Sequence, residues 1–177
     1  MVSQLKVNEI IKQSGSSITI GESGDTITLP STSTLTNFPE NTPCFWVAKD
    51  ATQSIAGDTQ VQLTFEEELL DSAGAFASST FTPQVAGYYF IYAQARFNSN
   101  SDADQWKMEL YKNGSSVNVG STVTRTQQTA QVSGLIQLNG SSDNVKFYVY
   151  HNLSGTNIDV QDQNQYTYAF GMRVIGI

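Results

Sequence analysis

The sequence has few of the residues that build catalytic or metal centres. Its 177 residues include one cysteine, Cys44, and one histidine, His151. A lone cysteine excludes an intrachain disulfide, and a single Cys with a single His argues against a zinc site or a Cys–His catalytic pair. We expect Cys44 to act as a small apolar residue where a strand begins, and His151 to be packed within or exposed on a strand. Neither a Gly-x-Ser-x-Gly motif nor a phosphate-binding loop occurs, so an enzyme is not expected.

Charged residues are also sparse and mostly acidic. They make up 14% of the chain, and the formal net charge is −7. No cluster of Lys and Arg is present, which argues against binding to a nucleic-acid backbone. No apolar run is long enough to span a bilayer, and the N-terminus lacks the order of a secretory signal. We therefore expect a protein made in a cytosol, with neither a nucleic acid nor a membrane as partner.

Amino-acid composition divides the chain into two regions. Residues 1–42 are rich in Ser, Thr and Gly and contain one aromatic residue, Phe38, whereas the other aromatic residues lie in 43–177. The join at 36–43 contains two prolines, which is typical of a short stiff linker. The sequence predicts an N-terminal stem or attachment region with its linker over 1–42 and a compact β head over 43–177.

The N-terminal region carries a short repeat with the period of a β-strand. Ser-Ile-Thr-Ile-Gly at 17–21 recurs as Thr-Ile-Thr-Leu-Pro at 26–30. Two such strands cannot bury their apolar faces alone, but three copies around an axis could. This indicates an intertwined homotrimeric stem, although a disordered tail is also compatible with the composition. The stem residues would be Ile18, Ile20, Ile27 and Leu29. An apolar patch precedes them and could dock to a partner or to the other subunits; it consists of Leu5, Val7, Ile10 and Ile11.

The head reads as short strands separated by turn signals, which is typical of a β-sandwich. The Asn-Gly pair at 113–114 predicts a tight hairpin, since both residues tolerate positive φ. Residues 66–71 have helical propensity, but we expect a loop and short strand there. The expected strands are 44–51, 60–65, 79–83, 88–98, 106–112, 116–126, 130–138, 145–151 and 166–177.

Several head motifs together resemble one family. Phe45 stands at the entry, 81–90 reads Phe-Thr-Pro-Gln-Val-Ala-Gly-Tyr-Tyr-Phe, 110–114 reads Leu-Tyr-Lys-Asn-Gly, and 168–175 closes with Tyr-Ala-Phe-Gly-Met-Arg-Val-Ile. This order resembles the globular head of complement's first component and its tumour-necrosis-factor-like relatives. The signature residues are Phe45, Phe81, Gly87, Tyr88, Phe90, Asn113, Gly114, Phe170 and Gly171. One departure is the turn after Gly140, which is longer than the Gly-Asp turn common in that family.

The resemblance implies an all-β jelly-roll sandwich of about ten strands that forms homotrimers. Gly87 and Gly171 would either let backbones approach near the trimer axis or serve turns within one subunit. Some relatives bind calcium, and two acidic pairs could supply oxygen ligands, Asp102 with Asp104 and Asp159 with Asp162. Their spacing matches no known calcium loop, so solvated surface acids are favoured and no cofactor is expected.

The N-terminal stem resembles those of small trimeric bacteriophage virion proteins. The sequence thus suggests a non-enzymatic virion protein, made in the host cytoplasm and attached to other virion proteins through its N-terminus. One version is a tail fibre or tip that binds a host glycan or protein; a second is a decoration protein that clamps the capsid at threefold positions. A third hypothesis is a free sugar-binding module. Recognition would use polar loops at 98–105 and 152–165, with candidates Asn100, Asp102, Asp104, Asn157, Asp159 and Asp162.

Overall fold

The computed structural model of the chain describes Ile10, Ile20 and residues 23–28, 41–98, 105–122 and 129–175. The chain divides into two units, Met1–Phe38 and Pro39–Ile177. In the first unit, Ile10, Ile20 and Ile27 expose 60%, 63% and 61% of their surface. The other expected stem and attachment residues lie outside the described residues: Leu5, Val7, Ile11, Ile18 and Leu29.

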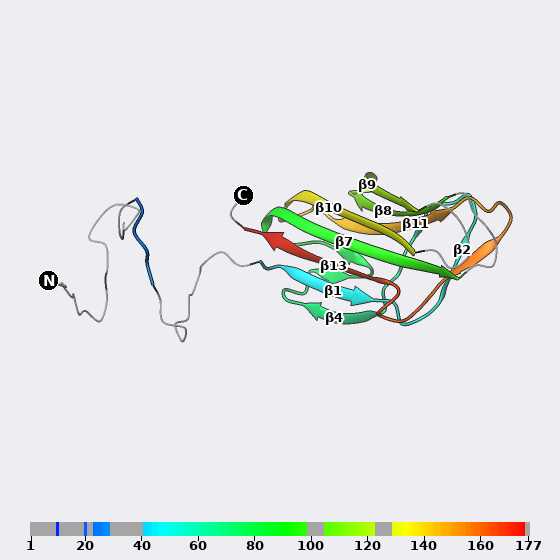
Figure 1. Cartoon of the computed structure of the whole chain (residues 1–177), viewed down its shortest axis with the longest axis horizontal. Helices are drawn as coiled ribbons and strands as arrows, with labels where there is room; N and C mark the ends of the chain where they lie inside the picture. Colours follow the sequence, from blue (N-terminus) through cyan, green and yellow to red (C-terminus); the bar gives the residue numbers. More distant parts are fainter. Residues whose placement is uncertain are drawn as a thin grey trace. The chain divides into compact units, whose positions relative to one another are not determined.

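The second unit, called the head below, is a jelly-roll sandwich of two antiparallel sheets (Figure 1). The first sheet runs in the order β2 (Gln53–Ala56), β12 (Asn157–Val160), β7 (Ala86–Asn98), β13 (Tyr168–Val174), β1 (Cys44–Ala48) and β4 (Glu67–Asp71), and β10 (Thr129–Asn139) also pairs with β7. The second runs β5 (Phe76–Ala77), β6 (Thr80–Phe81), β11 (Val145–His151), β8 (Trp106–Lys112) and β9 (Ser115–Thr122), and β3 (Val61–Gln62) also pairs with β11.

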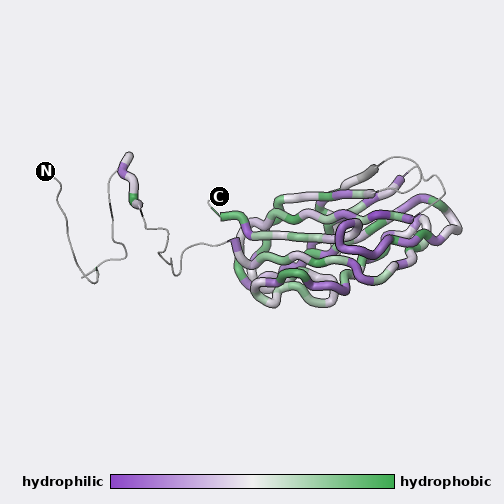
Figure 2. The backbone as a smooth tube through the Cα atoms, turned by 60° about the horizontal axis from the view of Figure 1, so that its bottom comes forward, coloured by the Kyte–Doolittle hydropathy of each residue, from purple (hydrophilic) through white to green (hydrophobic). Residues whose placement is uncertain are grey.

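Strict alternation of side chains places the core between the sheets. On β11, residues alternate between buried and half-buried positions along the whole strand, and apolar and polar residues alternate along many strands of the head (Figure 2). Aromatic rings fill the centre: Phe45 lies 4.5 Å from Phe81 and 5.0 Å from Phe76 between ring centroids. Such contacts add to the stabilisation from burial alone.

Gly171 on β13 makes room for the ring of Phe45. A Cβ built on Gly171 would lie 2.5 Å from Cε1 of Phe45. At Gly87, where φ is +155°, a Cβ would meet Nε of Arg173 at 3.0 Å. Both contacts lie within the head, and the two roles expected for these glycines stay predictions.

The expected strands match β1, β3, β6, β7, β8, β9, β10, β11 and β13. The segment 66–71 is not helical, as expected, and its residues 67–71 form β4. Three short strands were missed: β2, β5 and β12. The prediction that 152–165 is a continuous loop was wrong, because β12 lies within it and pairs with β2 and β7. No helix capable of crossing a membrane occurs in the part of the chain that the structure describes.

Candidate interaction face

The most unusual surface of the head is the outer side of the first sheet. Residues that point away from the core on a sheet are normally polar when they face water. Here they are large and apolar on five adjacent strands. We call this surface the aromatic face and define it by Trp46, Leu70, Tyr88, Phe90, Tyr92, Leu135, Tyr168, Phe170 and Met172.

Strand register brings these residues together from distant parts of the sequence. One row across the sheet pairs Leu70 with Trp46, Trp46 with Phe170, and Phe170 with Tyr92. A second row pairs Met172 with Phe90, and Phe90 with Leu135. Directly opposed side chains in antiparallel strands are within contact distance. The aromatic face is therefore one continuous surface rather than a set of scattered residues.

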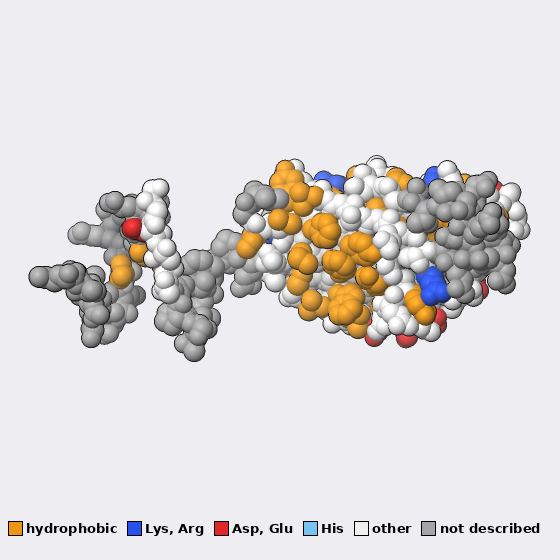
Figure 3. Space-filling view, in the orientation of Figure 1, with side chains coloured by type: hydrophobic (Ala, Val, Ile, Leu, Met, Phe, Trp, Pro, Cys, Tyr) orange, Lys and Arg blue, Asp and Glu red, His pale blue; other side chains and the backbone are white. Residues whose placement is uncertain are grey.

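Ring contacts hold this surface in a defined arrangement. Phe170 stacks on Tyr92 with ring centroids 5.2 Å apart, and Tyr168 lies 5.8 Å from Tyr92. Even so, Trp46 remains 46% exposed, Leu70 47% and Leu135 54%. Figure 3 shows hydrophobic side chains gathered over β1, β4, β7 and β13. A contiguous apolar patch of this kind marks an interaction site.

The aromatic face is hollowed at the end where the chain enters the head. A depression of about 570 Å³ lies over β1 and β13 and is lined by Asn41, Cys44, Phe45, Trp46, Leu70, Tyr168, Phe170, Gly171 and Met172. Cys44, at the start of β1 as expected, is half-buried on its wall. The depression can receive an apolar side chain from a partner.

Farther along the same strands, the outer side of the sheet becomes polar. Gln94 donates to the backbone oxygen of Tyr166 at 3.1 Å. The guanidinium of Arg96 lies 4.2 Å from the centre of the Tyr166 ring. The sheet thus has an apolar half near the chain entry and a polar half beyond it.

Tyr92 lies at the boundary between these halves and has an altered acidity. Its hydroxyl donates to Oε1 of Gln94 at 2.9 Å. Burial, with smaller contributions from the neighbouring Tyr168, raises the pKa of Tyr92 to about 12. The hydroxyl therefore stays neutral into strongly alkaline pH, where an ordinary tyrosine would already carry a charge.

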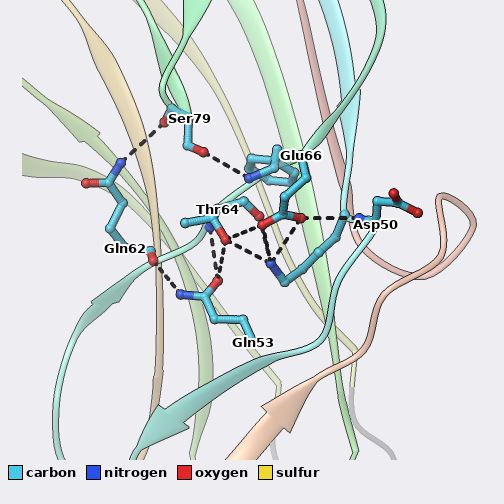
Figure 4. Close-up of polar contacts among 8 residues, drawn as sticks. Asp50, Gln53, Gln62, Thr64, Glu66 and Ser79 are labelled. Carbon is cyan, nitrogen blue, oxygen red and sulfur yellow. Dashed lines mark hydrogen bonds and ion pairs between the residues drawn. The ribbon is translucent and has the colours of Figure 1, made fainter.

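A buried cation organises the chain between β1 and β4 (Figure 4). Lys49 is 1% exposed, and its Nζ donates to the backbone oxygen of Thr64 at 3.0 Å and to Glu66 Oε1 at 3.1 Å. Gln53 extends the network by accepting from the Thr64 N–H at 3.0 Å. Burial lowers the pKa of Lys49, opposed by the Glu66 carboxylate. Burial alone would raise the pKa of Glu66, but hydrogen bonds from Thr64 and Lys49 together outweigh it and lower the pKa.

His151 lies fully buried at the end of β11. Its Nδ1 accepts from the Leu153 N–H at 3.3 Å, and its Nε2 lies 3.2 Å from the Ile55 oxygen. These contacts give it a structural role in holding β2 against the segment after β11. Among the described residues, no three His, Cys, Asp or Glu side chains gather in a way that could hold a metal ion.

The structure places the expected recognition residues in different settings. Asn157 and Asp159 are exposed on strand β12 rather than in a loop, and Asp162 is half-buried in the segment after it. Asn100, Asp102 and Asp104 lie outside the described residues. The proposed recognition site at the two loops therefore stays a prediction.

The signature residues also separate into different roles. Phe45 and Phe81 are buried in the core, and Asn113 and Gly114 form the β8–β9 turn with positive φ. Tyr88 and Phe90, however, are 39% and 38% exposed and belong to the aromatic face rather than to the core. Phe170 is half-buried beside them.

Sequence reasoning singled out Tyr88, Phe90 and Phe170 but missed the rest of the aromatic face: Trp46, Leu70, Tyr92, Leu135, Tyr168 and Met172. One signal was available in β7. Between Tyr88 and Tyr92, aromatic residues occur on both sides of the strand. A strand with one side exposed to water normally carries polar residues on that side.

Comparison with solved structures finds the same fold. The match to the crystal structure of murine APRIL covers 74% of this chain and 98% of the APRIL chain, with a TM-score of 0.57 and 9% sequence identity. The match to the structure of Eiger TNF from S. frugiperda covers 76% of this chain and 93% of the Eiger chain, with a TM-score of 0.59 and 7% sequence identity. No curated protein sequence matches the chain.

A family model provides the remaining comparison. The model of the TNF (Tumour Necrosis Factor) family matches residues 66–169, from just before β4 into β13. The match covers 104 of the 177 residues, which is more than half of the chain. The two-sheet architecture and the sequence pattern agree, and the chain belongs to the TNF (Tumour Necrosis Factor) family.

Proposed function

We propose that this chain is a non-enzymatic binding protein that works as a homotrimer, with the aromatic face as its subunit interface. The supporting observation is the continuous apolar row from Leu70 through Trp46 to Phe170 on the outside of a sheet. Exposed apolar surface of this kind is stabilised when a second protein surface removes it from water. The family fold also favours trimeric assembly.

A closed ring of three subunits requires each subunit to present two different surfaces. The aromatic face supplies one of them. Val117 and Val119 on β9, an edge strand of the second sheet, are 45% and 57% exposed and offer a second apolar surface. We propose that this edge packs on the aromatic face of the neighbouring subunit.

The native mass of the protein in solution tests the proposed assembly. Three chains of 19.3 kDa each would give about 58 kDa by light scattering. Trp46→Glu should shift this mass to that of one chain, because a charge would have to be buried at the interface. Val85→Glu is the matched control, since Val85 is 38% exposed and lies outside both surfaces. A monomeric unmodified chain, or a Trp46→Glu variant that remains trimeric, would contradict the proposal.

We further propose that the trimer is a virion protein, a fibre or tip that binds a host surface and attaches through its N-terminal region. The support is the strand-like repeat of residues 17–30 and the exposure of Ile20 and Ile27, which three copies could bury together. Deletion of residues 1–35 should leave the heads trimeric but abolish incorporation into particles. Incorporation of the shortened chain would refute the anchoring role, and location on the capsid would favour a decoration protein.

A further inference from the structure

The outer side of the second sheet carries a cluster of tyrosines that is separate from the aromatic face on the first sheet. Tyr148 and Tyr150 lie on β11, and Tyr111 lies on the neighbouring strand β8. Pairing places Lys107 opposite Tyr150 and Lys146 opposite Tyr111. We call Tyr111, Tyr148 and Tyr150, with the two lysines, the tyrosine face.

The three rings are held in place by their neighbours. The Tyr111 and Tyr148 centroids are 4.2 Å apart, and Nζ of Lys107 lies 4.8 Å from the centre of the Tyr150 ring. The Tyr150 hydroxyl donates to Oδ1 of Asp58 at 3.3 Å. Because the rings are already ordered, these side chains lose little conformational entropy when a ligand stacks on them.

A nearly buried carboxylate lies beside these rings on the same side of the sheet. Glu109 is 3% exposed, faces Tyr148 across the strand pair, and accepts from Ser116 Oγ at 3.0 Å. Burial raises the pKa of Tyr111, and Glu109 raises it further. Burial, followed by the charge of Asp58, raises the pKa of Tyr150. Both phenols therefore ionise only at more alkaline pH than an ordinary tyrosine, and the proton of Tyr150 is held in its hydrogen bond to Asp58.

We propose that the tyrosine face binds a neutral glycan chain. Half-buried tyrosines offer apolar ring surface for the C–H side of a sugar and a hydroxyl at the edge for its O–H groups. The surrounding charges cancel, since Lys107 and Lys146 are matched by Asp58 and Glu109, so no net field favours a polyanion. The inference rests on the proposed trimer only for its avidity, because three linked copies of the site would bind a repeating chain more tightly than one.

The experiment uses the full chain and neutral hexasaccharides of glucose, mannose, xylose and N-acetylglucosamine, with uronate hexasaccharides for comparison. An immobilised array identifies binding, and calorimetric titration of the bound hexasaccharide measures it. Tyr148→Ala should weaken binding at least about tenfold, whereas Tyr148→Phe, which keeps the ring, should stay within about threefold of the unmodified chain. Tyr166→Ala, which removes a tyrosine outside the tyrosine face, should leave binding unchanged.

A second measurement avoids any dependence on folded variants. In the unmodified chain, the aromatic NMR signals of Tyr111, Tyr148 and Tyr150 should shift when the bound hexasaccharide is added. No binding to any neutral hexasaccharide, stronger binding to the uronates, or shifts confined to other tyrosines would overturn the inference. The native mass of the same sample tests the trimer separately, so a trimer that binds no glycan refutes only the glycan site.

Discussion

At the scale of single residues, Gly171 shows how closely the core is packed. A Cβ there would lie 2.5 Å from the Phe45 ring and 3.2 Å from Cγ1 of Ile91. Gly171→Ala should therefore reduce the free energy of unfolding by about 2 kcal/mol, because core overpacking forces side chains out of their preferred rotamers. Urea denaturation measures this. Phe45→Leu in the same chain should recover part of the loss, and strictly additive effects would contradict a direct clash.

Lys49 provides a second test at this scale. Its ammonium group is the centre of the network that joins Thr64 and Glu66. Lys49→Met keeps most of the apolar stem but removes the donor to the Thr64 backbone oxygen and leaves the Glu66 carboxylate without its cation, although Thr64 Oγ1 still donates to Glu66. We expect a loss of about 2 kcal/mol in urea denaturation, since Glu66 is partly exposed and water replaces part of the interaction.

Lys146→Met serves as the control for Lys49, because Lys146 is only half-buried and its ammonium group makes no hydrogen bond or ion pair within the described residues. It should change the free energy of unfolding by less than about 0.5 kcal/mol. Equal effects of the two substitutions would show that the network around Lys49 contributes nothing specific.

At the scale of secondary-structure elements, the side chain of Asn139 binds three backbone groups in the long turn after β10. Oδ1 of Asn139 accepts from the N–H groups of Ser141, Ser142 and Asp143, each at 3.0 Å. Asn139→Ala should lower the free energy of unfolding by about 1.5 kcal/mol, because three backbone donors lose their acceptor. Asn139→Asp, which keeps the acceptor, should lose less in the same denaturation assay. The reverse order would contradict this role.

The strands that could be predicted from sequence are those whose alternation is long. β11 and β8 each show seven residues with the period of a strand, and an Asn-Gly turn marks the start of β9. β2 and β12 have only four residues each, with one buried large apolar residue on β2 and two on β12. Such short patterns do not predict a strand, and the two strands form because they pair with each other and, for β12, with β7.

The aromatic face was harder to predict for a different reason. Alternation tells which residues share a side of a strand, but it does not tell which side faces the core when both sides are apolar. On β7, Tyr89 and Ile91 point inward while Tyr88 and Phe90 point outward. Only the register with β13 and β10 places Phe90 beside Met172 and Leu135 and so reveals the continuous surface.

At the scale of the whole molecule, alkaline pH should weaken both the fold and the proposed trimer. The pKa of Tyr92 is raised to about 12 in the folded chain against an ordinary value of 10.0. Its contribution to stability is complete below pH 10 and is lost as the pH rises towards 12, because the unfolded chain ionises first. Light scattering and circular dichroism against pH should show dissociation and unfolding in this window.

Tyr92→Phe separates this effect from general alkaline damage. The variant keeps the ring stacked on Phe170 but has no hydroxyl to ionise. Its stability should fall less steeply between pH 10 and about 12 than that of the unmodified chain. Identical profiles would show that other tyrosines control the alkaline transition.

The position of β1 has a mechanical consequence. The chain enters the head at Asn41, whose oxygen accepts from the Arg173 N–H at 3.1 Å, and continues into β1 between β13 and β4. Tension applied along β1 from this point would load the hydrogen bonds to both neighbouring strands in parallel, as a shear, rather than breaking them one at a time. A tether joined here would pull on the head in a direction that two rows of hydrogen bonds resist together.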